Sequence, residues 1–257
     1  MKKQLLFAAS LLVLQSQTLA HDFWTIEKEA SVGAPLTVLL GFGHNFPSGE
    51  EITAEQMKTR FEPLRAWGPD GELSLTPGSE PRLAVSEKPI AAGSYLLAAS
   101  SQIGFNSQTP DGWVRLPKNE TTGATRCVYG GNFAKAVANV GDSTDSDTIQ
   151  KTLGHKLEIV PLINPVIVKV GQTLPVKVLK DGQPLPNTSL GAYFAGFTAD
   201  GSAQAFSAMT NKEGLVNIIP LRSGYWLAEV SFRGAYADTA KCDTENFSAT
   251  LTFRIND

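Results

Sequence analysis

Cysteine and histidine are scarce in this chain of 257 residues, which has two cysteines and three histidines. It contains no Cys-x-x-Cys pair, no His-Glu-x-x-His segment and no Gly-x-Ser-x-Gly segment. These absences exclude paired-thiolate zinc sites, the common zinc peptidases and the serine hydrolases with a nucleophile elbow. We therefore expect a protein that is not an enzyme.

Two further features are missing. The formal net charge is −3 and no stripe of Lys and Arg runs along the chain, so nucleic acid is not an expected partner. No apolar run after residue 20 approaches the roughly 20 residues that a membrane-spanning helix needs. We expect no membrane anchor in the mature protein.

The first 20 residues have the three parts of a secretory signal peptide. Lys2 and Lys3 are followed by an apolar stretch from Leu5 to Leu14 and by the small-residue cleavage site Thr18-Leu19-Ala20. The stretch is about half as long as a membrane span. The sequence thus predicts export to the bacterial periplasm, with cleavage after Ala20.

The two cysteines lie far apart in this exported chain. In an oxidising compartment such a pair favours a disulfide over metal binding, so we predict a Cys127–Cys242 bond that closes a long loop.

Short segments rich in β-branched and aromatic residues, bounded by Gly, Pro, Asn or Asp, predict a mainly β protein. The predicted strands are 34–41, 95–101, 157–161, 166–170, 174–179, 190–197, 215–219, 226–232 and 249–255. Segments 53–61 and 132–140 have helix-compatible composition, the second because Phe133, Val137 and Val140 have helical spacing.

The segment Pro161 to Pro165 has the composition of a stiff junction. We therefore predict two β-sandwich-like domains after the signal peptide of residues 1–20. Residues 21–160 form a β-rich metal-site domain with one or two short helices. Residues 161–257 form an immunoglobulin- or transthyretin-like sandwich.

Cleavage after Ala20 makes His21 the first residue of the mature chain. Its free α-amine, with a pKa near 8, and its imidazole can then chelate one metal ion. A second imidazole opposite them completes a three-nitrogen site called a histidine brace, which suits Cu(II) or Ni(II). The alternative is that His21 is simply the residue that cleavage exposes.

The other two histidines are the candidates for that second imidazole. His44 lies in the loop Gly41-Phe-Gly-His44-Asn-Phe46-Pro47 directly after a predicted strand, where ligands are often held. A backbone hydrogen bond within the turn is an equally good interpretation. His155, at the start of a strand, is more typical of a structural histidine.

These segments resemble a bacterial family of periplasmic domains of unknown function, often labelled nickel-uptake or NikM-like. The resemblance runs from His21-Asp-Phe-Trp through Gly154-His-Lys-Leu-Glu-Ile-Val-Pro161 to Gly224-Tyr-Trp226 and Ser248 to Phe253. It implies an extracytoplasmic, metal-associated β-sandwich protein. It favours His21 and His44 as ligands and leaves His155 as a third candidate.

The function expected from these observations is binding of nickel, cobalt or copper for uptake, delivery or buffering. Asp22 and Glu158 are candidates for an axial oxygen ligand or for a carboxylate that orients a ligating imidazole through a hydrogen bond. A membrane metal-uptake permease is a possible partner. Two alternatives remain open: an interaction module without metal, and a copper mono-oxygenase, for which the scattered tryptophans offer no flat substrate face.

Overall fold

The computed structural model describes residues 22–198 and 203–257, which form three hydrogen-bonded sheets. The largest sheet has ten strands: β3 (Arg65–Gly68), β4 (Gly71–Glu72), β7 (Gly93–Ser100), β8 (Gly104–Thr109), β9 (Gly112–Val114), β10 (Arg126–Val140), β14 (Ser189–Phe194), β15 (Phe206–Met209), β17 (Gly224–Ala235) and β18 (Thr244–Ile255). Their order is β15-β14-β17-β18-β10-β7-β3-β4, and the β8–β9 hairpin pairs with β10. We call it the central sheet.

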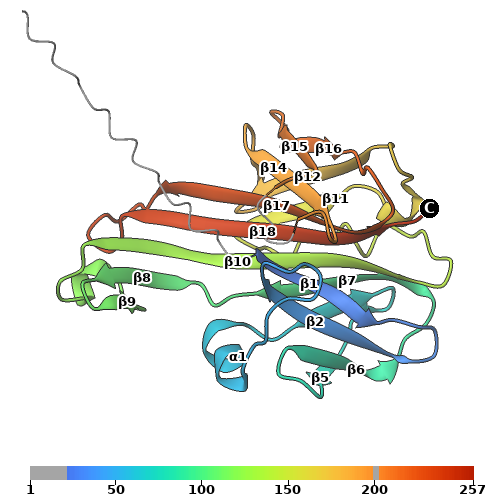
Figure 1. The fold of residues 1–257 in the computed structure, drawn as a ribbon, viewed down its shortest axis with the longest axis horizontal. Helices are drawn as coiled ribbons and strands as arrows, with labels where there is room; N and C mark the ends of the chain where they lie inside the picture. The colour runs from blue at the N-terminus through green and yellow to red at the C-terminus, as the bar shows by residue number, and fades with distance from the viewer. Residues whose placement is uncertain (1–21, 199–202) are drawn as a thin grey trace, which may run out of the picture.

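Two smaller sheets cover opposite faces of the central sheet (Figure 1). The N-terminal sheet contains β1 (Asp22–Glu29), β2 (Pro35–Gly43), β5 (Leu75–Pro77) and β6 (Leu83–Pro89). The opposite sheet contains β11 (Leu157–Pro161), β12 (Leu174–Lys180), β13 (Gln183–Pro184) and β16 (Leu215–Ile218). The predicted mainly β, sandwich-like fold class is confirmed.

Strands from both predicted domains share the central sheet. β10 and β18 run parallel, from Val128 opposite Thr244 to Ala136 opposite Thr252. The predicted boundary at residue 160 falls inside β11, which packs with β12 in the opposite sheet. A continuous ladder of backbone hydrogen bonds therefore joins the two halves of the chain.

The helix predicted for residues 132–140 is wrong, because this segment is the second half of β10. Ala134 and Ala136 pack in the core beneath the N-terminal sheet, whereas Phe133 and Val137 pack in the core beneath the opposite sheet. A strand buried on both faces has apolar residues at almost every position. Some of these apolar residues therefore also have the spacing of one face of a helix.

The helix predicted near residues 53–61 is confirmed as α1 (Ala54–Arg60). Thr53 caps it, and its hydroxyl accepts a hydrogen bond from the backbone N–H of Gln56 while the Gln56 side chain accepts one from the backbone N–H of Thr53. The strand predicted for 166–170 is wrong. Pro165 starts the short 3₁₀ helix η2 (Pro165–Ile167), which Asn164 caps. A second short 3₁₀ helix, η1 (Lys118–Glu120), follows β9.

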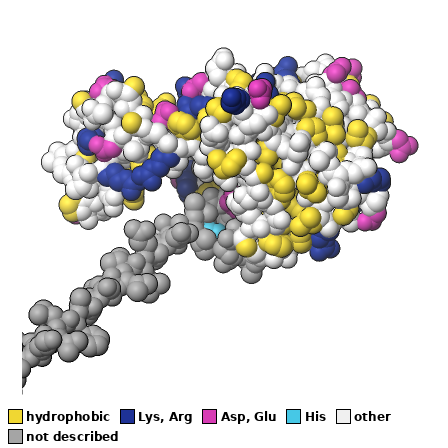
Figure 2. All heavy atoms as spheres, turned by 90° about the horizontal axis from the view of Figure 1, so that it is seen from above, with side chains coloured by type: hydrophobic (Ala, Val, Ile, Leu, Met, Phe, Trp, Pro, Cys, Tyr) yellow, Lys and Arg dark blue, Asp and Glu magenta, His cyan; other side chains and the backbone are white. Residues whose placement is uncertain are grey.

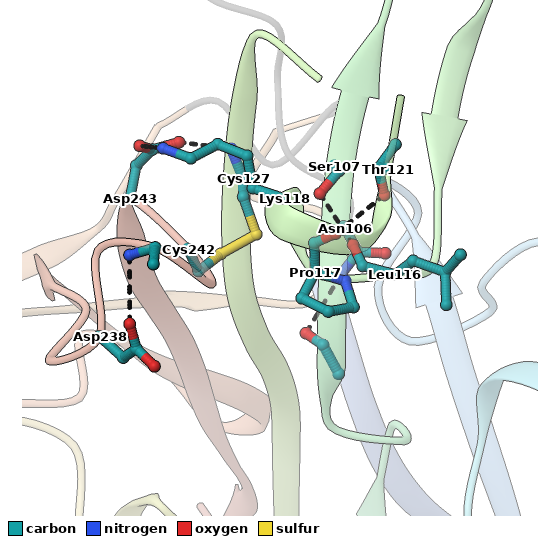
Figure 3. Close-up of a disulfide and its surroundings, with 12 residues drawn as sticks. Asn106, Ser107, Leu116, Pro117, Lys118, Thr121, Cys127, Asp238, Cys242 and Asp243 are labelled. Atoms are coloured by element: carbon teal, nitrogen blue, oxygen red, sulfur yellow. Dashed lines mark hydrogen bonds and ion pairs between the residues drawn. A yellow bond between two sulfur atoms is a disulfide. The ribbon is translucent and has the colours of Figure 1, made fainter. Parts of the chain in front are cut away.

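The predicted disulfide is present between Cys127 and Cys242, which are 115 residues apart in sequence (Figure 3). It links β10 to the loop before β18, and both cysteines are fully buried. Beside it, Asp243 pairs with Lys118 and accepts a hydrogen bond of 2.7 Å from the backbone N–H of Cys127. Closing a loop of this length stabilises a fold by roughly 4 kcal/mol.

No helix in the part of the chain that the structure describes is long and apolar enough to cross a membrane.

Candidate metal centre

The candidate site lies at the start of β1, where the first described residue pairs with the end of β2. Asp22 is opposite Gly43 in this antiparallel ladder, and His44 follows directly after β2. The ladder continues through Phe23 opposite Phe42 and Trp24 opposite Gly41. Phe23 and Trp24 are buried on opposite faces of β1, Phe23 in the core beneath the N-terminal sheet and Trp24 in a cluster with Tyr193, so a shift by one residue would exchange the two environments.

The loop that carries His44 is packed onto a buried tryptophan. The Trp24 ring is fully buried, and its indole N–H donates a 3.3 Å hydrogen bond to the carbonyl of Pro47. A Cβ atom at Gly41 would lie 2.0 Å from the Trp24 ring, so glycine is required there. The ring of Phe46 packs edge-on against Trp24 at 5.6 Å between centroids. His44, itself half-buried, is thus held on a rigid support.

The backbone just before His44 also demands glycine. Gly43 has a φ of 118°, in the range that residues with a Cβ rarely adopt. A Cβ atom there would lie 2.6 Å from the side chain of Glu50. The backbone N–H of Glu50 donates a 2.7 Å hydrogen bond to the carbonyl of Phe42, which closes the loop. The fold therefore requires glycine on both sides of Phe42.

A group of polar side chains surrounds Asp22. The hydroxyl of Tyr193, on β14, donates a 2.5 Å hydrogen bond to Asp22 Oδ2. Glu229, on β17, shares a hydrogen bond with Asp22 and accepts a 2.8 Å hydrogen bond from the Gln204 amide. We call Asp22, Tyr193, Gln204 and Glu229 the carboxyl cluster.

Burial and the neighbouring charge of Asp22 raise the pKa of Glu229 to about 7. Burial and the same charge also raise the pKa of Tyr193. Below pH 7 Glu229 is therefore mostly protonated, so that the O–H groups of Glu229 and Tyr193 are both directed at Asp22. The cluster lies at the end of the β1–β2 ladder, where Asp22 pairs with Gly43 and His44 follows.

His155 and Glu158 lie on the other side of the central sheet. The His155 ring stacks on Phe133 at 4.9 Å between centroids, and Phe133 belongs to the core beneath the opposite sheet. Burial lowers the pKa of His155 to about 4. Its Nδ1 atom is buried and has no hydrogen-bond partner within the described residues.

Glu158 is occupied by a buried ion pair rather than directed at His44. Its Oε1 atom lies 2.9 Å from Lys135 Nζ and accepts a 2.8 Å hydrogen bond from the backbone N–H of Leu153. The structure thus brings Asp22 next to the His44 loop and leaves His155 and Glu158 together elsewhere.

His21 and the predicted signal peptide lie outside the described residues. Within residues 22–198 and 203–257, no three side chains of His, Cys, Asp or Glu form a group able to hold a metal ion.

Tyr193 and Glu229 are site residues that the sequence did not indicate. They come from β14 and β17, about 170 and 200 positions after Asp22, and they reach it only because these strands join the central sheet. Each occupies one position in an ordinary strand, so no local signal marks it.

Comparison with known proteins gives one match to a family model. Residues 18–234 match the domain of unknown function DUF4198. No curated protein matches the chain at a significant level.

Solved structures align with the chain only weakly. They include the D0-D1 domain of Intimin, at 14% identity over 90% of this chain and 97% of that one, with a TM-score of 0.22. A chimeric titin Z1Z2 aligns at 12% identity over 93% and 98% with a TM-score of 0.20. Fibronectin(III)-like modules of Clostridium thermocellum CbhA align at 10% identity over 89% and 94% with a TM-score of 0.19. Scores this low carry no argument.

Proposed function

We propose that this chain, which belongs to the DUF4198 family, binds one divalent transition-metal ion at its mature N-terminus in the periplasm. The ion, nickel, cobalt or copper, is cargo for uptake, delivery or buffering, and a membrane permease is the partner for its transfer. His21 supplies the α-amine and one imidazole, and His44 supplies the opposing imidazole.

The pairing of Asp22 with Gly43 carries this proposal. His21 is bonded to Asp22, and His44 is bonded to Gly43. Opposed Cα atoms are at most about 5.5 Å apart and consecutive ones about 3.8 Å, so the Cα atoms of residues 21 and 44 are at most about 13 Å apart. Two imidazoles on such a span can meet at one ion.

The charge at this place favours a cation. Asp22 keeps its carboxylate between the hydroxyl of Tyr193 and the carboxyl of Glu229. A carboxylate beside nitrogen ligands orients them and increases the attraction for a divalent ion. His155 has no part in the proposal, because its ring is stacked in the core on the far side of the central sheet.

The test is a calorimetric titration of Cu(II) and Ni(II) into mature protein purified without an N-terminal tag. Intact mass first establishes that the chain begins at His21. We expect one ion per chain, with Cu(II) bound more tightly than Ni(II). A variant with one glycine added before His21 keeps every side chain but loses the chelating amine, and should bind at least about tenfold more weakly.

Two histidine variants complete the test. His44→Ala should weaken binding as the added glycine does, whereas His155→Gln should bind like the unmodified protein. Equal affinities for the extended and unextended chains would exclude the N-terminal chelate. An interaction module without metal would then be the better account.

A further inference from the structure

A second polar site lies beside the candidate metal centre, between α1 and the β8–β9 hairpin. It is a groove of about 250 Å³ whose walls include Arg60 and Arg115, and no Asp or Glu is among the described residues that line it. Figure 2 shows Lys and Arg side chains, with Asp and Glu side chains among them, along the border between the smaller lobe and the main body. Two cations without an acid stand out in a chain with a net charge of −3.

Aromatic rings fix the guanidinium group of Arg60. Its Cζ atom lies 5.2 Å from the ring centroid of Phe42 and 5.7 Å from that of Phe61. These cation–π contacts hold the group against the two rings. Arg60 has no carboxylate partner within the described part of the chain.

Arg115 is held close to Arg60 by the backbone of α1. Its Nη1 atom donates a 2.8 Å hydrogen bond to the carbonyl of Thr59, the residue before Arg60, and Nη2 makes a weaker 3.4 Å contact with the carbonyl of Gln102. A guanidinium group has five N–H donors, so three remain. Placing two like charges together costs free energy, which an anion between them would offset.

The floor of the groove is glycine backbone with amide side chains beside it. A Cβ atom at Gly130 would lie 2.0 Å from the carbonyl oxygen of Asn246, so the close approach of β10 to β18 requires glycine. The Oδ1 atom of Asn132 accepts a 2.7 Å hydrogen bond from Ser248. The Asn132 NH₂ group then remains as a donor, and Asn246 provides a second side-chain amide at the groove.

We propose that this groove binds a small organic dicarboxylate, with the forks of Arg60 and Arg115 on its carboxylates and the asparagine amides as further donors. Planar guanidinium groups match carboxylate oxygens in pairs, which gives orientation as well as charge. The proposal does not depend on metal binding, since none of its residues is a candidate metal ligand.

The experiment is a calorimetric titration of the mature protein with succinate, inorganic phosphate and the neutral analogue succinamide. The protein is first desalted from any chelator, because polycarboxylate chelators would compete for the groove. We expect succinate to bind and succinamide not to bind. Arg60→Gln and Arg115→Gln should each weaken succinate binding by about tenfold or more.

Matched variants separate a specific site from general charge. Arg222→Gln removes an arginine that also stacks on an aromatic ring, Phe194, but lies outside the groove, and should leave succinate affinity unchanged. Arg115→Lys keeps the charge without the fork and should bind more weakly than the unmodified protein. Thermal unfolding checks that each variant is folded.

Three outcomes would overturn the proposal. They are the absence of succinate binding at millimolar concentration, an equal loss in Arg222→Gln, and binding of phosphate in preference to succinate. The last would assign the groove to a phosphate-bearing ligand instead.

Discussion

His44 and His155 have similar local sequences but opposite environments in the fold. Each follows a glycine with a positive φ, 118° at Gly43 and 74° at Gly154. His44 lies half-buried on a supported loop and follows Gly43, the backbone partner of Asp22. His155 lies against Phe133 in the core, near both members of the Lys135–Glu158 ion pair. A Gly-His pair therefore says little about ligand capacity, because the two imidazoles differ in burial.

The two sides of the central sheet also hold their charges differently. On the His155 side, the side chains of Lys135 and Glu158 are 0% and 2% exposed, and they pair with each other. On the His44 side, the carboxyl cluster combines two half-buried acids, Asp22 and Glu229, with the buried Tyr193. The first arrangement neutralises charge internally, whereas the second keeps a negative charge near the surface.

The largest loss of stability should come from Lys135→Met, a change on the His155 side. The change leaves Glu158 buried without its cation, so we expect the free energy of unfolding to fall by about 3–5 kcal/mol. Urea denaturation measures it. The double variant Lys135→Met/Glu158→Gln keeps an acceptor for the Leu153 N–H without the charge and should recover much of the loss. A loss below about 1 kcal/mol in Lys135→Met would show that water reaches the pair.

That ion pair also shows where prediction of the fold from sequence stops. The strands with clear boundaries, such as 157–161 and 174–179, could be predicted because β-branched residues and turns mark them. β10 could not, since both of its faces are buried and Lys135 interrupts its apolar run. The reason for a buried lysine there lies in Glu158, 23 positions away, and only the packed layers bring the two together.

The second prediction concerns the acid stability of the His155 side. Burial lowers the pKa of His155 to about 4 in the folded chain, whereas the unfolded value is about 6.5. The unfolded chain thus binds the proton first, and stability falls as the pH drops from 6.5 to 4. Allowing for partial exposure, we expect the unmodified protein to lose about 2 kcal/mol more over this range than His155→Gln.

Denaturation series at several pH values compare these two proteins, and other acids that titrate in both cancel in the difference. Parallel curves between pH 6.5 and pH 4 would mean that the folded His155 accepts a proton as readily as the unfolded one.

On the His44 side, stability should depend on pH in the opposite direction. Burial and Asp22 raise the pKa of Glu229 to about 7 from its usual value of 4.5. Its contribution to stability is complete below pH 4.5 and is lost as the pH rises through 7. Glu229→Gln stays neutral and still accepts from Gln204, so at pH 8 it should be more stable than the unmodified protein by about 1 kcal/mol.

At pH 4 the two proteins should unfold with similar free energies, and chemical denaturation at both pH values measures the difference. A Glu229→Gln variant that is less stable at pH 8 would mean that Glu229 is ionised there and contributes through its charge.

The candidate site could be predicted in part. Asp22 and His44 could be identified because one follows the predicted cleavage site and the other lies in a glycine-rich loop. The strand register that makes Asp22 and Gly43 neighbours could not be predicted in the same way, because β1 and β2 are buried at consecutive positions and show no alternation. Tyr193 and Glu229 could not be found, because their approach to Asp22 depends on long-range strand order.

The smallest expected effect on stability is that of His44→Ala. Its ring is half-buried on a loop that Trp24 and Phe46 already hold, so the free energy of unfolding should change by less than about 1 kcal/mol. His155→Ala removes a ring stacked in the core and should cost about 2 kcal/mol. Thermal unfolding of both variants without metal measures the contrast. If His44→Ala proved the more damaging, His44 would be a structural part of its turn. A small cost would instead mean that the fold does not need His44. Its position after Gly43, the backbone partner of Asp22, would then support a role of His44 as a metal ligand.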